Sequence, residues 1–291
     1  MLKQRLASGL MIVLVLIVAT QWAPSVLALL IIASLSCLGQ LEFYSMCRKT
    51  GITVFAVPGL LAGVALITVT FFTIGPSADS MANAYRWEQV VLFAGLLVIL
   101  LRQLPRGADG NAMASISCSL LGIWYVAYTL NFFTRLVFRW DQCLTGVGVG
   151  TTGCRLVLYL VLVVKITDVG AYFTGRFLGK HKAFPRLSPK KTWEGVAGGI
   201  VAAVISSMVF VTAVGGSFGA ITIGWVHAII LGLLLSFVGI VGDLFESLLK
   251  RASGVKDSSN AVPGMGGVLD VLDSLLFGTP VLYLYITCFL D

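Results

Sequence analysis

Long apolar runs recur along this sequence and leave few folds open to the chain. A helix needs about 20 mostly apolar residues to cross the hydrocarbon layer of a membrane. Of all residues, 58% are hydrophobic and 11% are charged, whereas about 25% of a soluble domain is charged. The sequence therefore predicts an all-α, polytopic membrane protein with about nine transmembrane helices. The predicted spans are residues 6–22, 24–41, 52–74, 87–104, 112–133, 156–178, 196–214, 220–241 and 268–290.

The first apolar run follows Lys3 and Arg5 and so begins like a secretion signal. A signal peptide would end in a small-x-small cleavage site, and none precedes Trp22. We therefore interpret residues 6–22 as the first membrane helix, which stays in the mature protein.

The cysteines give little indication of a site. None of the six belongs to a CxxC pair, so they do not suggest zinc. Cys143 and Cys154 flank one loop rich in glycine and threonine. A disulfide between them would form only if that loop faced an oxidising compartment.

The net charge of +7 is interpreted as the positive-inside bias of membrane loops together with an anionic ligand or lipid headgroup. No Lys/Arg-rich arm or RNA-binding motif suggests nucleic acid. The bases concentrate in two loops, 176–195 and 242–267. Two predicted spans separate these loops, so both loops lie on one face of the membrane. With a cytoplasmic N-terminus, most of the 20 Lys and Arg residues lie on the cytoplasmic side, as the positive-inside rule requires.

Carboxylates gather beside the same basic loops. On a helix that continues past residue 241, Asp243, Glu246 and Lys250 would share one face. Asp270 and Asp273 have the same i, i+3 spacing at the start of the last predicted helix. Helix capping and the helix dipole explain one such aspartate, but a shared cation explains two beside a third carboxylate better. Hard oxygen ligands favour Mg²⁺.

Two further segments suit anions. Glycines in 256–267 allow close backbone approach to a ligand, and the N-terminus of the following helix favours negative charge. Lys190 and Lys191 precede Trp193. These lysines could anchor the chain at the membrane interface or hold phosphates as point charges.

Together these segments resemble the phosphatidate cytidylyltransferase family. The longest match is Gly242-Asp243-Leu-Phe-Glu246-Ser-Leu-Leu-Lys250-Arg251, followed by Gly254-Val-Lys256-Asp257-Ser, Pro263-Gly264, Gly266-Gly267-Val-Leu-Asp270 and Asp273-Ser274. Two upstream blocks agree with it, Lys165-Ile-Thr-Asp168-Val-Gly170-Ala-Tyr172-Phe-Thr-Gly175-Arg176 and Ser188-Pro189-Lys190-Lys191-Thr192-Trp193-Glu194-Gly195. The resemblance spans about 165 to 275.

The resemblance implies an enzyme of phospholipid biosynthesis that makes CDP-diacylglycerol and pyrophosphate from CTP and phosphatidic acid. It also implies Mg²⁺ with a monovalent ion such as K⁺ beside it, nine transmembrane helices in a homodimer, and an inner-membrane site open to the cytoplasm. At matching positions, the cation-binding carboxylates would be Asp243, Asp270 and Asp273. The catalytic candidates would be Lys250, Arg251, Lys256, Asp257 and Asp168. The substrate-binding candidates would be Ser188, Lys190, Lys191, Gly266 and Gly267.

Two positions depart from the family pattern. Met265 stands where the family usually has His, and Val271 where it usually has Arg. The three aspartates are untouched, so we still expect the activity. A CTP-dependent enzyme for another lipid, such as a dolichol-kinase-like or ether-lipid cytidylyltransferase, stays open, as does an inactive relative. A transporter is less favoured, because the charges crowd at loop–helix junctions on one face and no repeat is visible.

The sequence predicts two regions. Residues 1–150 form N-terminal transmembrane helices that serve as a scaffold and give lipid access, and their scattered polar residues are interpreted as helix ends and loops. Residues 151–291 form the C-terminal transmembrane catalytic region.

Overall fold

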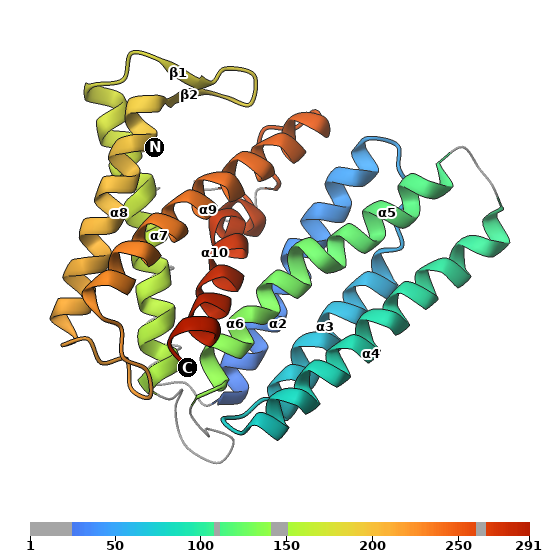
Figure 1. Ribbon diagram of the computed structural model, residues 1–291. Coiled ribbons are helices and arrows are strands. Elements are labelled where there is room, and N and C mark those ends of the chain that lie inside the picture. The colour runs from blue at the N-terminus through green and yellow to red at the C-terminus, as the bar shows by residue number, and fades with distance from the viewer. Residues whose placement is uncertain (1–24, 108–110, 141–150, 260–265) are drawn as a thin grey trace. The chain divides into compact units, whose positions relative to one another are not determined.

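The computed structural model describes residues 25–107, 111–140, 151–259 and 266–291 (Figure 1). Within these residues, eight helices are long and apolar enough to cross a membrane. The all-α, polytopic fold class is confirmed, and the predicted first span, 6–22, lies outside the described residues. The chain forms two compact units, Met1–Gly150 with Leu249–Val271 and Thr151–Leu248 with Leu272–Asp291.

The first unit is built on N-terminal helices that pack through small residues. Gln40 of α2 donates hydrogen bonds to the carbonyl oxygens of Gly59 and Gly122, at 3.1 and 3.3 Å. Tyr44 fills the space above the same two glycines, where any Cβ would collide with its ring. Small residues thus let these helices approach closely, as in other membrane bundles. The elements are α2 (Ser25–Lys49), α3 (Ala56–Thr73), α4 (Ala78–Gln103), the 3₁₀ turn η1 (Leu104–Arg106), α5 (Ala112–Gly122), the π-helical η2 (Ile123–Tyr128) and α6 (Thr129–Phe138).

A buried ion pair connects three helices of this unit. Glu88 of α4 pairs with Arg135 of α6 and accepts hydrogen bonds from Thr70 Oγ1 of α3 and Asn131 Nδ2 of α6, at 2.6 and 3.0 Å. Charged residues inside a membrane protein persist where they pair with one another. Glu88 lies within the predicted span 87–104, whereas Arg135 lies past the predicted end at 133, because α6 continues to Phe138.

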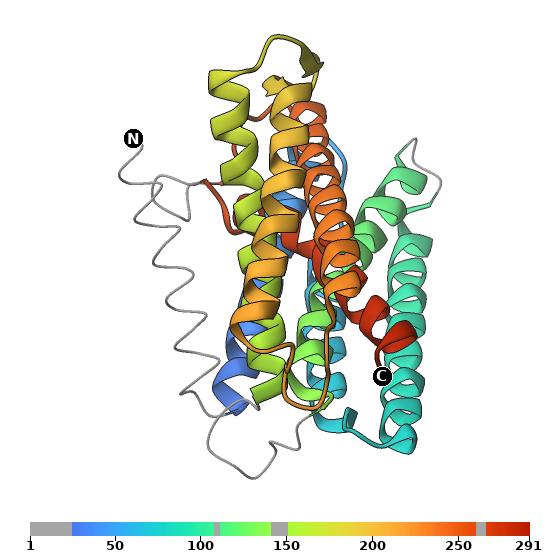
Figure 2. The ribbon, with the colours of Figure 1, turned by 60° about the vertical axis from the view of Figure 1, so that its left-hand side comes forward.

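The second unit contains α7 (Thr151–Phe177), α8 (Trp193–Ala213), α9 (Trp225–Ala252) as far as Leu248, and α10 (Val268–Phe289) from Leu272. Helices α7 and α8 lie side by side in both views (Figures 1 and 2). A Cβ at Gly170 would be 2.5 Å from that of Ala202, and one at Gly199 would be 2.8 Å from the carbonyl oxygen of Thr167. Glycines therefore bring these helices into close contact.

A short hairpin joins α7 to α8, a feature that the sequence did not predict. Strand β1 (Lys182–Phe184) pairs antiparallel with β2 (Ser188–Thr192). Thr192 then caps α8 by accepting a hydrogen bond from the Gly195 amide at 3.2 Å. The hairpin thereby fixes the lysines of β2 relative to the start of α8.

Candidate active site

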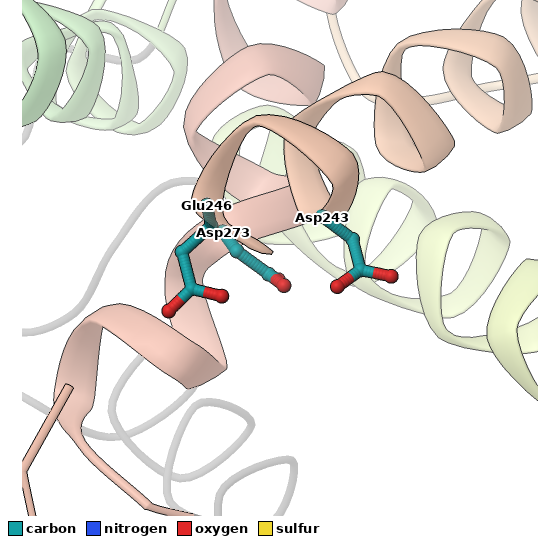
Figure 3. Close-up of side chains that lie close together, drawn as sticks. All are labelled: Asp243, Glu246 and Asp273. Atoms are coloured by element: carbon teal, nitrogen blue, oxygen red, sulfur yellow. The ribbon is translucent and has the colours of Figure 1, made fainter. Parts of the chain in front are cut away.

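Three carboxylates of the second unit converge. Asp243 and Glu246 lie one turn apart on α9, and Asp273 lies on α10, with one oxygen of each within 4.8 Å of the others (Figure 3). Gly242 permits this approach, because a Cβ there would be 2.6 Å from the carbonyl oxygen of Asp273. The structure thus brings together two aspartates that the sequence predicted as cation ligands. It adds Glu246, which the sequence analysis noted on the same face without assigning it to the site.

Two lysines interact with this acidic triad, defined as Asp243, Glu246 and Asp273. Lys191 of β2 forms an ion pair with Asp243, and both side chains are half-buried. On α7, Lys165 and Asp168 lie close enough to interact electrostatically with Asp273. Four carboxylates so close repel one another unless cations compensate them. Hard oxygen donors in such a group suit Mg²⁺, so the residues present fit a divalent ion.

A second carboxylate group lies in the first unit. Asp270, in the first turn of α10, accepts a hydrogen bond on Oδ1 from Lys250 Nζ at 2.6 Å. Its Oδ2 accepts from the amide and hydroxyl of Ser258, at 3.0 and 2.7 Å, and from the Gly267 amide at 2.6 Å. The bond to Gly267 is the backward half of a capping box, in which an acidic side chain at the third helical position binds the N-cap amide. The aspartate therefore holds Ser258 and Gly267 of the loop before α10 (253–267, described at 253–259 and 266–267), and its role as a cation ligand stays a prediction.

The two glycines of this loop are required by geometry. Gly266 has a φ of 101°, and a Cβ there would be 2.5 Å from Asp270 Oδ2. At Gly267 a Cβ would collide with Ser258 Oγ and Glu42 Oε2. Only glycine leaves both the backbone and these side chains in place.

Glu42 is a member of this group that sequence reasoning missed. The predicted span ended at residue 41, but α2 runs on to Lys49 and the Glu42 side chain is buried. A carboxylate at the edge of a long apolar run was the available signal, since such residues usually have a buried partner. Its partners, Ser258, Ser259, Val268 and Leu269, lie more than 200 residues away in the sequence.

The remaining candidates lie nearer the surface. Arg251 ends α9, Lys256 and Asp257 follow it, and Lys190 lies on β2; all four are exposed, while Ser188 of β2 is half-buried. Val271 is buried on α10. Met265 lies outside the described residues, as does Cys143, so the disulfide to Cys154 stays a prediction.

The chain matches known proteins over nearly its full length. The model of the Cytidylyltransferase family matches residues 3–289. A phosphatidate cytidylyltransferase of Bacillus subtilis is 31% identical over 290 residues, which cover 99% of this chain and 98% of the relative. One of Staphylococcus aureus (strain COL) is 32% identical over 89% of this chain and 86% of its own. One of Haemophilus influenzae is 44% identical over 44% of each chain.

Proposed function

Because the chain belongs to the cytidylyltransferase family, we propose that it transfers the cytidylyl group of CTP to phosphatidic acid, with CDP-diacylglycerol and pyrophosphate as products. It is then a nucleotidyltransferase of phospholipid biosynthesis. The observation that carries the proposal is the acidic triad, held with Lys191 on helices that can span a membrane. The relatives named for phosphatidate favour this acceptor over another lipid.

The reaction needs alignment and charge neutralisation more than covalent chemistry by the protein. A phosphate oxygen of phosphatidic acid attacks the α-phosphorus of CTP, and the bond from that phosphorus to the bridging oxygen breaks. Pyrophosphate leaves with the electron pair. Lysines and arginines of the site would balance the negative charge of both substrates, which is their role as point charges.

We assign the cation to the acidic triad. Asp243 and Asp273 are the predicted ligands that belong to it, Glu246 joins them, and Asp270 stays a proposed ligand. Bound Mg²⁺ would supply Lewis acidity and orient the phosphates. The K⁺ implied by the family resemblance is proposed beside it.

The other site residues keep their proposed roles. Lys191 contacts Asp243 and so can reach a phosphate held near the triad. Lys250 lies within hydrogen-bonding distance of Asp270. Ser188, Lys190, Gly266 and Gly267 are proposed for substrate, and Arg251, Lys256, Asp257 and Asp168 for catalysis.

The protein is a multi-pass integral membrane protein by its helices. We further propose that it resides in the inner membrane as a homodimer, with the basic hairpin and the loop before α10 in the cytoplasm. Labelling of single cysteines placed in the hairpin, with a reagent that does not cross membranes, tests the orientation. Light scattering on the purified detergent complex tests the dimer.

The deciding experiment measures transfer of label from CTP carrying ³²P at its α-phosphate into chloroform-extractable lipid. The purified protein is supplied with phosphatidic acid and K⁺, with and without Mg²⁺. We expect CDP-diacylglycerol to form only with Mg²⁺. Folded protein that makes no labelled lipid from phosphatidic acid would contradict the proposal, and labelling of another lipid would identify a different acceptor.

A further inference from the structure

Glu42 binds the N-terminal turn of α10 from a helix far away in the sequence. Its Oε1 accepts hydrogen bonds from Ser259 Oγ and the Val268 amide, at 2.6 and 2.9 Å. Its Oε2 accepts from Ser258 Oγ and the Leu269 amide, at 3.0 and 2.8 Å. Each oxygen of the buried Glu42 carboxylate therefore accepts one hydrogen bond from the loop before α10 and one from the first turn of α10.

The first amides of α10 depend on this carboxylate. The initial N–H groups of any helix lack intrahelical acceptors, and a side chain at the N-cap normally supplies one. Here the residue before Val268 is Gly267, which has no side chain. Glu42 supplies the missing acceptor, and its negative charge also complements the helix dipole.

The same contacts connect Glu42 to Asp270. The Ser258 hydroxyl lies 3.0 Å from Glu42 Oε2 and 2.7 Å from Asp270 Oδ2, so it bridges the two side chains. Asp270 in turn binds Lys250 and the Gly267 amide. A shift of the Glu42 carboxylate would therefore change the positions of Asp270, Lys250 and the loop backbone together.

We propose that Glu42 is a positioning residue, which holds Ser258, Ser259 and Asp270 in place by capping α10 from α2. This inference rests on the proposed function for its effect on catalysis, but not for its structural part. Helix α2, which belongs to the region predicted to be a scaffold, would thus position Asp270.

The structural part is tested by amide hydrogen exchange in the full-length protein in detergent. Glu42→Gln keeps the shape of the side chain but replaces one acceptor oxygen by an NH₂ group, which cannot accept from a backbone amide. We expect at least one of the Val268 and Leu269 amides to exchange at least about tenfold faster, while amides later in α10 are unchanged. Unchanged exchange at both positions would overturn the proposal.

The matched control is Glu88→Gln, which alters the other buried carboxylate of the N-terminal helices described above. It removes half of the ion pair with Arg135 and should lower the melting temperature. Within the part of the chain that the structure describes, Glu88 accepts hydrogen bonds from Thr70, Asn131 and Arg135, none of which belongs to the loop before α10. In Glu88→Gln, the Val268 and Leu269 amides should therefore exchange at the wild-type rate below the melting transition. If exchange increased equally in both variants, Glu42 would stabilise the fold in general and would not position the start of α10.

The catalytic part is tested by the Mg²⁺ concentration that gives half-maximal activity, measured on folded protein. Glu42→Gln should raise it at least about tenfold and lower kcat, whereas Glu88→Gln should leave it unchanged. If Glu42→Gln does not fold, Ser259→Ala tests the same contact, because it removes one donor and should raise the Mg²⁺ requirement about threefold. An unchanged Mg²⁺ requirement in the folded variants overturns the catalytic part of the proposal. If the wild-type protein itself has no activity, the proposed function is contradicted instead, and the hydrogen-exchange test of the structural part still applies.

Discussion

The two carboxylate groups of the molecule differ in what compensates their charge. Glu42 and Asp270 accept hydrogen bonds from serine hydroxyls, backbone amides and Lys250, and these donors serve all four carboxylate oxygens. In the acidic triad, carboxylates of Asp243, Glu246 and Asp273 approach one another, and Lys191 pairs with one of them. Protein donors compensate the first group, whereas the second concentrates negative charge.

This difference separates two uses of a buried carboxylate. A charge inside a membrane protein is costly unless paired, so crowded carboxylates indicate a function that requires them. Protein donors make the Glu42 and Asp270 group a structural element that holds Ser258, Ser259 and the start of α10. The triad resembles a site that is completed by a cation, and the two groups should respond differently to the same change from acid to amide.

The largest effect is expected for Asp273→Asn. Loss of one carboxylate from the triad should lower kcat/KM roughly a thousandfold or more, because several kcal/mol of charge stabilisation depend on the cation. The melting temperature should be equal to or above that of the wild type, since the change relieves repulsion. Lipid labelling and thermal unfolding in detergent measure the two quantities.

Asp79→Asn makes the same chemical change at an exposed position of α4 and serves as the control. It should leave both quantities unchanged. Near-normal activity of folded Asp273→Asn would remove the triad from the cation site.

Asp270→Asn sharpens the comparison because it affects the other group. Activity should fall about a hundredfold, since the amide group cannot accept all four of the hydrogen bonds that Asp270 accepts. Unlike Asp273→Asn, this variant should also expose the Gly267 amide to faster hydrogen exchange. If both variants lost activity with unchanged exchange, the distinction between the two groups would fail.

Lys191→Ala should have a smaller effect, about tenfold on kcat/KM for CTP, because the lysine is half-buried and water screens part of its charge. The triad would then lack the positive charge of Lys191, so activity should depend more strongly on the Mg²⁺ concentration. Lys191→Arg keeps the charge and should recover most of the activity. An arginine variant as inactive as the alanine variant would assign Lys191 a role that depends on its shape instead of its charge.

The sequence predicted the acidic triad better than the group of Glu42 and Asp270. Helical spacing placed Asp243 and Glu246 on one face, because contacts within one helix follow from its period. Glu42 was missed because its partners Val268 and Leu269 are distant in the sequence, and hydropathy treats an acidic residue as a helix end. Only the folded chain reveals that backbone amides satisfy it.

The helices also extend past several of the predicted membrane spans. Helix α4 begins at Ala78, well before the predicted residue 87, and Ser77 caps it there by accepting a hydrogen bond from the Ser80 amide. Helix α9 continues to Ala252, past the predicted end at 241, so that its polar last turns carry the site. Apolar length therefore predicted that the spans exist, while polar turns and caps that hydropathy does not detect extend the helices beyond them.

The smallest effect is expected for Lys256→Gln, at the exposed end of the loop before α10. An exposed charge attracts anionic substrates only through water, so its removal should change kcat/KM about two- to threefold. That loss should vanish near 1 M salt, where the Debye length falls to about 3 Å, whereas the loss in Lys191→Ala should largely persist because burial limits screening. Salt titration of both variants with lipid labelling measures this contrast, and a salt-independent loss at Lys256 would place that side chain against the substrate.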